Sequence, residues 1–166
     1  IPLRLVGSEM CIRDSCIGGG LATALSCDVR LASEKSTFAI PAAKLGLAYD
    51  YLGIKRLREI VGPAKAKYIF YTARQFSSNE ALRIGIIEEV FQNDSFSKDV
   101  MSVLNTINSN APLTISSAKL AIDADPSDDE MFKKCKELER ICFSSKDYEE
   151  GRLAFSEKRK PVFKGH

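Results

Sequence analysis

Histidine and closely paired cysteines are scarce in this sequence. The only histidine is His166, and the five cysteines contain no Cys-x-x-Cys pair. A zinc or other metal site and a Cys–His catalytic pair are therefore not expected. We interpret the cysteines as reduced, which is typical of an intracellular protein, and the choice between cytoplasm and mitochondria stays open. They are Cys11, Cys16, Cys27, Cys135 and Cys142.

The sequence also lacks a long apolar run and a large net charge. No apolar stretch approaches the roughly 18 residues that a membrane span needs, so we expect no membrane partner. The formal net charge of +2 is too small, and its charges too scattered, to indicate a nucleic-acid partner. A chain of 166 residues with 45% hydrophobic and 28% charged residues is long enough for a domain with a hydrophobic core.

The beginning of the chain differs in character from the rest. Residues 5–15 read LVGSEMCIRDS and resemble a peptide encoded by a transposon end that is used in sequencing libraries. We therefore interpret residues 1–15 as a non-native, adaptor-derived segment, and we expect residues 5–15 to pack poorly and to have no role. On this interpretation native sequence begins near Cys16 and an N-terminal part is missing. The alternative is a genuine N-terminal strand and turn.

The following residues alternate between helical and strand-like patterns. The run Gly18–Gly20 precedes a short helical pattern, and glycines at such a place let a ligand approach free backbone N–H groups. Residues 28–33 and 36–40 are typical of short strands joined by a turn. Helical patterns then take over, interrupted by Gly62. These repeated units predict an α/β core over residues 16–94.

The remainder, residues 95–166, has helical periodicity throughout. The expected helices cover residues 95–109, 112–124, 128–145 and 147–159. Capping boxes are expected at Ser77 with Glu80 and at Ser127 with Glu130. One apolar stripe on the third of these helices indicates either packing within the chain or a subunit interface. It consists of Met131, Cys135, Leu138 and Cys142.

Three motifs occur in order along the chain. The first is IGGG, which opens a helix and is followed by SCDVRLAS. The second is STFAIPAAKLGL, and the third is the ending EGRLAFSEKRKPVFKGH. Together they resemble motifs of the crotonase superfamily, the enoyl-CoA hydratase/isomerase family. The resemblance implies an α/β fold in which residues 16–94 form part of a ββα spiral core. It also implies that residues 95–166 form a helical trimerisation region, and that the whole protein is a homotrimer or hexamer.

The resemblance further implies an acyl-CoA substrate, with coenzyme A as part of the substrate and no other cofactor. In this family two backbone N–H groups hold a thioester enolate, and Gly19 matches the second of these donors. Preorganised donors stabilise the charge that develops on the thioester oxygen. Hydratases of the family carry glutamates at the positions of Ala22 and Ala42. Since a methyl group cannot transfer a proton, we expect a lyase, decarboxylase or isomerase rather than a hydratase.

Tyr49 and Asp50 are the polar candidates for catalysis. A tyrosine at this position resembles the methylmalonyl-CoA decarboxylase branch, and an aspartate at the next resembles the dienoyl-CoA isomerase branch. Tyr49 would orient a carboxylate or donate a proton, and Asp50 would shuttle a proton. The alternative is that Asp50 caps the following helix and Tyr49 packs against it.

Phe155 and Lys158 match positions that contact the adenosine diphosphate end of coenzyme A in some members of the family. A cation near phosphates and an aromatic ring near adenine fit that role. The alternative is a surface helix end with a core phenylalanine. Two other functions stay open, an enoyl-CoA hydratase and a non-catalytic acyl-CoA-binding homologue. We expect this stretch of chain to be inactive by itself.

Overall fold

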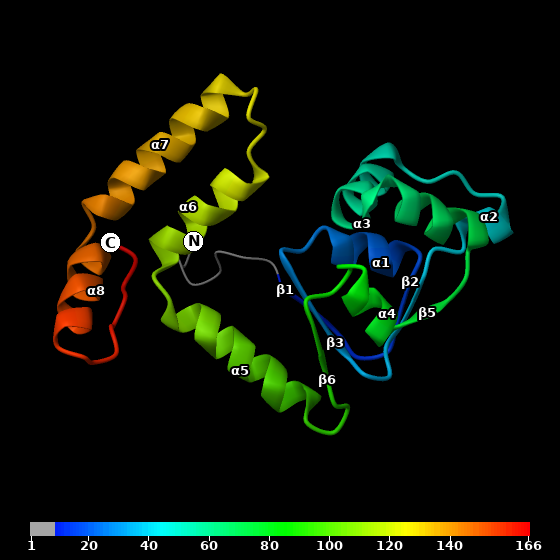
Figure 1. Cartoon of the computed structure of the whole chain (residues 1–166), viewed down its shortest axis with the longest axis horizontal. Helices are drawn as coiled ribbons and strands as arrows, with labels where there is room; N and C mark the ends of the chain where they lie inside the picture. Colours follow the sequence, from blue (N-terminus) through cyan, green and yellow to red (C-terminus); the bar gives the residue numbers. More distant parts are fainter. Residues whose placement is uncertain (1–8) are drawn as a thin grey trace. The chain divides into compact units, whose positions relative to one another are not determined.

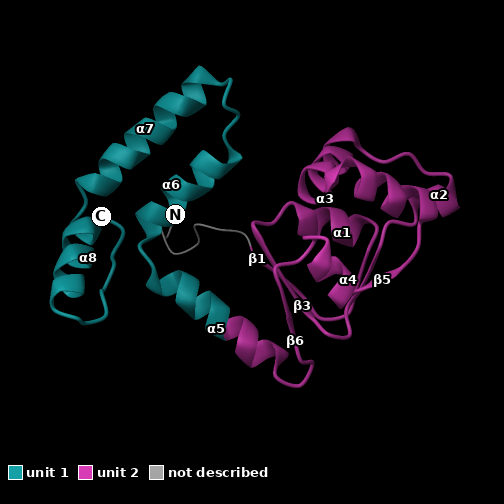
Figure 2. Cartoon of the chain, in the orientation of Figure 1, with its two compact units in different colours: residues 1–7, 102–166 teal, residues 8–101 magenta. Residues whose placement is uncertain are grey.

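A computed structural model describes residues 9–166 of the chain (Figure 1). These residues divide into two compact units between residues 101 and 102 (Figure 2). We call residues 9–101 (magenta, labelled unit 2 in Figure 2) the first unit, which contains the strands and the helices α1 to α4. Residues 102–166 (teal, labelled unit 1 in Figure 2) are the second unit, which contains helices alone. Helix α5 (Phe96–Ser109) runs across the division. The predicted order, an α/β part followed by a helical part, is confirmed.

The strands of the first unit form two three-stranded sheets. The first sheet has the order β1–β3–β6 with parallel pairing, and it consists of β1 (Glu9–Ile12), β3 (Val29–Ser33) and β6 (Glu89–Phe91). In the second sheet β4 is parallel to β2 and antiparallel to β5, and the strands are β2 (Ser15–Ile17), β4 (Thr37–Ala39) and β5 (Phe76–Ser77). The predicted turn after β3 therefore carries the chain from one sheet to the other.

Strand β1 overturns one expectation about the start of the chain. Cys11 is paired with Leu31 in the parallel ladder with β3, and Ile12 is buried in the core. The prediction that residues 5–15 pack poorly is therefore wrong for the strand residues 9–12. Residues 13–15 are exposed, and residues 5–8 lie outside the described part. Ladder hydrogen bonds use backbone groups that any non-proline residue offers, so an unusual sequence does not prevent such pairing. The adaptor origin of the segment stays a prediction.

The core of the first unit lies between its sheets and helices. The helices are α1 (Gly19–Leu25), α2 (Ala42–Leu45), α3 (Tyr51–Thr72) and α4 (Ser78–Arg83). Their apolar faces join inward side chains of the strands in one cluster. The largest of the fully buried side chains are Phe38, Leu21, Leu25, Leu31, Ile40, Leu57, Ile86 and Ile87.

Helix α3 is kinked at Gly62, as the sequence predicted. Gly62 has φ 76° and ψ 162°, a conformation that an L-residue with a side chain rarely adopts, and Pro63 follows it. Before the kink, Leu57 is fully buried, whereas Leu52 is 69% exposed. The kink gives the two halves of α3 different directions, which matters for the cavity described below.

A buried arginine joins the first sheet to the loop before β6. The guanidinium of Arg30 donates to the carbonyl oxygen of Ile86 at 2.6 Å and to that of Cys27 at 2.5 Å. It also forms an ion pair with Glu88, whose carboxylate accepts the backbone N–H of Arg30 as well. Arg30 is only 5% exposed, so these partners satisfy a charge that burial would otherwise destabilise.

The predicted helices of the second part are confirmed to within a few residues. Besides α5 they are α6 (Pro112–Asp123), α7 (Asp129–Phe143) and α8 (Lys146–Ser156). Both α6 and α7 lack fully buried residues, and the predicted stripe of α7 is only partly covered. No helix in residues 9–166 is both long and apolar enough to cross a membrane.

Of the two predicted capping boxes, one has a different capping residue and the other is confirmed only for its serine. Asp128, not Ser127, caps α7, because its carboxylate accepts the N–H groups of Glu130 and Met131 at 3.0 Å each. A charged acceptor at a helix N-terminus also interacts favourably with the helix dipole. At α4 the hydroxyl of Ser77 accepts from Glu80 N–H at 3.3 Å, as predicted. The Glu80 carboxylate, however, pairs with Arg74 instead of returning to the cap.

Candidate active site

The glycine run forms a tight turn that leads into α1. Gly18 has φ 59° and ψ −119°, and its N–H donates to the Ala39 carbonyl oxygen at 2.9 Å. The first helical bond runs from Ala22 N–H to the Gly18 carbonyl oxygen at 3.1 Å. The N–H groups of Gly19 and Gly20 therefore have no partner inside the helix. A Cβ atom on Gly19 would meet nothing within 4 Å, so the space in front of this turn is open.

Tyr49 lies beside this turn. A Cβ atom placed on Gly18 would be 3.9 Å from the Tyr49 hydroxyl oxygen. The Tyr49 ring packs edge-on against Phe70, with 5.3 Å between ring centroids. Partial burial raises the pKa of Tyr49, so the phenol keeps its proton at neutral pH. The structure thus places a hydrogen-bond donor next to the glycine turn.

A cavity of about 600 Å³ opens at Tyr49 within the first unit. Most of its wall is apolar or aromatic, which suits a small-molecule site. The residues that line it are Ala42, Ala43, Leu47, Tyr49, Ile54, Arg58, Pro63, Ala66, Lys67, Phe70 and Tyr71. The sequence had singled out only Ala42 and Tyr49 among them. The others come mainly from both halves of α3, and their spacing along the chain gave no signal of a common site.

Asp50 has a different position from its neighbour. Its carboxylate accepts the N–H groups of Leu52 at 2.9 Å and Gly53 at 3.3 Å, so Asp50 is the N-cap of α3. Its side chain is exposed and does not line the cavity. The capping interpretation of Asp50 is confirmed, and its role as a proton shuttle stays a prediction.

The two alanines offer no acid or base in this region. Ala42 is 3% exposed and lines the cavity near Tyr49. Ala22 is partly buried on α1, one helical turn after Gly18. Because neither methyl group transfers a proton, Tyr49 is the ionisable side chain of the cavity that lies beside the glycine turn.

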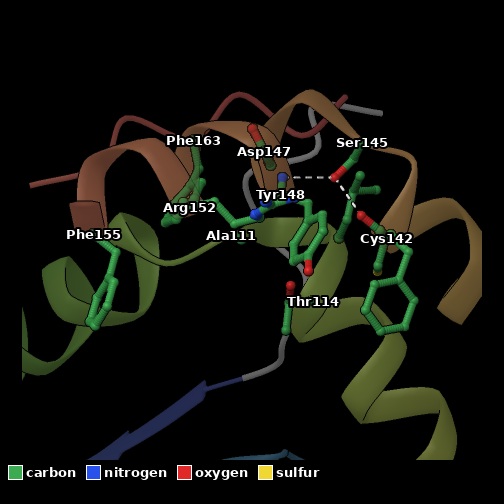
Figure 3. A pocket seen from close by; sticks show the side chains of 12 residues that line it. Ala111, Thr114, Cys142, Ser145, Asp147, Tyr148, Arg152, Phe155 and Phe163 are labelled. Carbon is green, nitrogen blue, oxygen red and sulfur yellow. Dashed lines mark hydrogen bonds between the residues drawn. The ribbon is translucent and has the colours of Figure 1, made fainter. Parts of the chain in front are cut away.

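A second cavity, of about 550 Å³, lies within the helical unit (Figure 3). Its lining residues are Ala111, Leu113, Thr114, Cys142, Phe143, Ser145, Asp147, Tyr148, Gly151, Arg152, Phe155 and Phe163. Phe155 is 87% exposed, so the alternative of a core phenylalanine is wrong. Lys158 lies past the end of α8 with a left-handed φ of 54° and does not line this cavity.

The C-terminal tail is attached to α8 by two acidic residues that the sequence analysis did not single out. The carboxylate of Asp147 accepts the backbone N–H groups of Lys164 at 2.7 Å and Gly165 at 2.8 Å. Glu150 accepts Val162 N–H at 2.8 Å and pairs with both terminal nitrogens of Arg159 at 2.6 and 2.8 Å. These bonds attach the last residues of the chain to α8.

No resident metal site is apparent among residues 9–166. In that part of the chain no group of three or more His, Cys, Asp or Glu side chains is arranged to hold a metal ion.

Comparison with known proteins relates this geometry to characterised families. The profile of the enoyl-CoA hydratase/isomerase family matches residues 11–166. The chain is 36% identical over 146 residues to the short-chain-enoyl-CoA hydratase of Clostridium acetobutylicum, covering 87% of this chain and 56% of that protein. It is 30% identical over 159 residues to the methylmalonyl-CoA decarboxylase of Escherichia coli, covering 93% of this chain and 61% of that protein.

Solved structures agree with the sequence relatives. The crystal structure of an enoyl-CoA hydratase/carnithine racemase from Magnetospirillum magneticum has a TM-score of 0.85 and 30% identity to this chain. It matches 95% of this chain, which covers 59% of that structure. The chain thus spans little more than half of the length of these proteins.

Proposed function

Because the chain belongs to the enoyl-CoA hydratase/isomerase family, we propose that the whole protein is an acyl-CoA enzyme that forms and quenches a thioester enolate. The backbone N–H of Gly19 is one donor of the oxyanion hole. The reaction is a decarboxylation, another lyase reaction or an isomerisation rather than a hydration. Coenzyme A enters as part of the substrate.

The position of Tyr49 is the observation that carries this proposal. Its hydroxyl lies at the glycine turn, where an enolate oxygen held by Gly19 would carry negative charge. A protonated phenol at that place donates a proton to an enolate or orients a carboxylate that is leaving as carbon dioxide. Hydration needs a group that activates water, and Ala22 and Ala42 supply none. Asp50, which caps α3, is the second candidate for proton transfer.

Hydration is the second candidate function, and the names of relatives favour it. The relatives from Clostridium acetobutylicum and Syntrophomonas wolfei, 36% and 33% identical to this chain, are both named as hydratases. In a hydratase, the part of the protein outside this chain would have to supply the water-activating group. Loss of both activities would instead leave the protein as an acyl-CoA-binding homologue.

The test compares two reactions in the protein expressed from its complete reading frame. Exchange of the α-protons of butyryl-CoA in deuterated water reports enolate formation, and loss of crotonyl-CoA absorbance reports hydration. We expect exchange to be faster, and Tyr49→Phe to slow it by about 10²–10⁴-fold. The matched control is Tyr51→Phe, because Tyr51 lies at the start of α3, close to Tyr49 in the sequence, and is 74% exposed. Faster hydration, or exchange that is unaffected by Tyr49→Phe, would contradict the proposal.

We extend the proposal to coenzyme A binding and to assembly. Phe155 and Lys158, both exposed in this chain, are proposed to contact the adenosine diphosphate end of coenzyme A. Lys158→Ala should weaken coenzyme A binding at low salt, and Lys160→Ala is the control.

The partly covered faces of α6 and α7 are proposed to meet a second copy in a homotrimer or hexamer. A stable monomer at micromolar concentration in light scattering would contradict that assembly.

A further inference from the structure

Two cations line the cavity beside Tyr49, and neither has an acidic partner among the described residues. Arg58 and Lys67 both contribute to its wall, and none of the other lining residues is acidic. Ion pairs on α3 are formed by Lys55 and Arg56, which both pair with Glu59. Within residues 9–166 neither Arg58 nor Lys67 is in an ion pair. The cavity therefore combines apolar surface with positive charge that no ion pair within residues 9–166 neutralises.

The kink at Gly62 brings these two cations to one cavity. Arg58 lies before the kink and Lys67 after it. In a straight helix, the regular spacing of residues would not direct both side chains to the same cavity. Both residues are exposed, so their cationic groups are accessible to a ligand that binds against the apolar wall of the cavity. An anion with an apolar body is the ligand chemistry that this arrangement fits.

The spacing along α3 separates Arg58 from the thioester end of the cavity. Arg58 follows the N-cap Asp50 by eight positions, which corresponds to a rise of about 12 Å along the helix. Tyr49 and the glycine turn lie at the N-terminal end of that helix. The Cα atom of Arg58 is thus displaced along α3 from Tyr49, so the two side chains enter the cavity from different positions along its wall.

We infer that the acyl group of the substrate carries a carboxylate at its far end, which Arg58 and Lys67 bind. The substrate is then a monothioester of a dicarboxylic acid. The inference rests on the proposed function for the position of the thioester, and it adds the chemical class of the acyl chain. An arginine and a lysine that converge on one carboxylate make charge-assisted hydrogen bonds with it.

The test measures dissociation constants by calorimetry for glutaryl-CoA, valeryl-CoA and free coenzyme A, using the protein from its complete reading frame. The two acyl chains have equal length and differ in the terminal carboxylate. We expect glutaryl-CoA to bind about 10-fold more tightly, with a preference that decreases at high salt. Arg58→Gln and Lys67→Gln should each reduce this preference and leave valeryl-CoA binding unchanged. Lys55→Gln, on the same helix outside the cavity, should alter none of the three.

Other outcomes overturn the inference in distinguishable ways. Equal binding of glutaryl-CoA and valeryl-CoA by the unaltered protein would exclude a carboxylate site, whatever the variants do. If Arg58→Gln and Lys67→Gln weaken all three ligands equally, the cations bind phosphates of coenzyme A instead. A clear preference for glutaryl-CoA without α-proton exchange would support this inference and contradict the proposed function. Exchange of α-protons without a preference for glutaryl-CoA would support the proposed function and contradict this inference.

Discussion

The two units of this chain are stabilised in different ways. The α/β unit buries large side chains such as Phe38, Leu57 and Ile86 almost completely. In the described residues after 101, the apolar side chain that is buried to this extent is Ala154. Both units expose some large apolar side chains, among them Leu52 and Tyr71 in the α/β unit and Ile122, Phe132 and Phe143 in the helical unit, so the buried core is what distinguishes them. The order of the helical unit depends on helix caps, on the attachment of its tail and, in the proposed assembly, on a second copy.

This contrast predicts which substitutions should reduce stability in each unit. In the α/β unit the core both stabilises the fold and holds the glycine turn and Tyr49 in place. In the helical unit the last residues of the chain are held by hydrogen bonds to single polar groups, such as Asp147 and Glu150. Local polar contacts should therefore dominate stability there, and apolar truncations should have little effect.

The largest expected difference is between two phenylalanines. Phe38→Ala removes a fully buried ring and should lower the free energy of unfolding by about 3–5 kcal/mol. Phe132→Ala, at a side chain that is 60% exposed, should change it by less than about 0.5 kcal/mol. Urea denaturation followed by circular dichroism measures both. Similar losses for the two variants would mean that Phe132 is part of a core.

The next effect concerns attachment of the tail. Asp147→Ala removes the acceptor of two backbone N–H groups at a site that is 5% exposed, so it should cost about 2–3 kcal/mol. Asp147→Asn keeps one acceptor oxygen and should have an intermediate effect. Hydrogen exchange of the Lys164 and Gly165 amides gives the local readout. Unchanged protection in Asp147→Ala would show that other contacts hold the tail.

A smaller effect is expected at the cap of α3. Asp50→Ala should reduce stability by about 1 kcal/mol, whereas Asp50→Asn keeps a capping oxygen and should stay within about 0.5 kcal/mol. The same pair separates capping from catalysis. A proton shuttle would make Asp50→Asn slow α-proton exchange strongly without loss of stability. An Asp50 that only caps would leave the rate of Asp50→Asn near that of the unaltered protein.

The smallest effect is a pH dependence of the tail. Pairing with Arg159 and the N–H of Val162 lowers the pKa of Glu150 from 4.5 to about 2. Because the pKa is lower in the folded state, its contribution is fully present above about pH 4.5 and is lost as the pH falls towards 2. Protection of the Val162 amide should follow that range in NMR exchange and decrease with salt. Glu150→Gln should remove the dependence, and a transition near pH 4.5 would contradict the pairing.

Much of the local structure was predictable from neighbouring residues. The strands around residues 28–40, the break at Gly62 and the helices after residue 95 follow from patterns that are a few residues long. The errors concern choices between groups that are equally able to form a bond. Ser127 and Asp128 are both good caps, and Asp128 is the one whose carboxylate reaches two N–H groups of α7. Glu80 pairs with Arg74 because an ion pair offers it a charged partner.

The sequence by itself determined the order of elements, the glycine turn before α1 and the absence of glutamates at residues 22 and 42, because each depends on residue type and local spacing. Only the tertiary structure decided that Tyr49 reaches Gly18, whereas the Asp50 cap of α3 is a local bond that the sequence offered as one of two roles. The tertiary structure alone also decided that Arg58 and Lys67 line one cavity. Such contacts depend on the direction of α3 on either side of Gly62 and on packing against α2, and neither is encoded by the spacing of residues along one element.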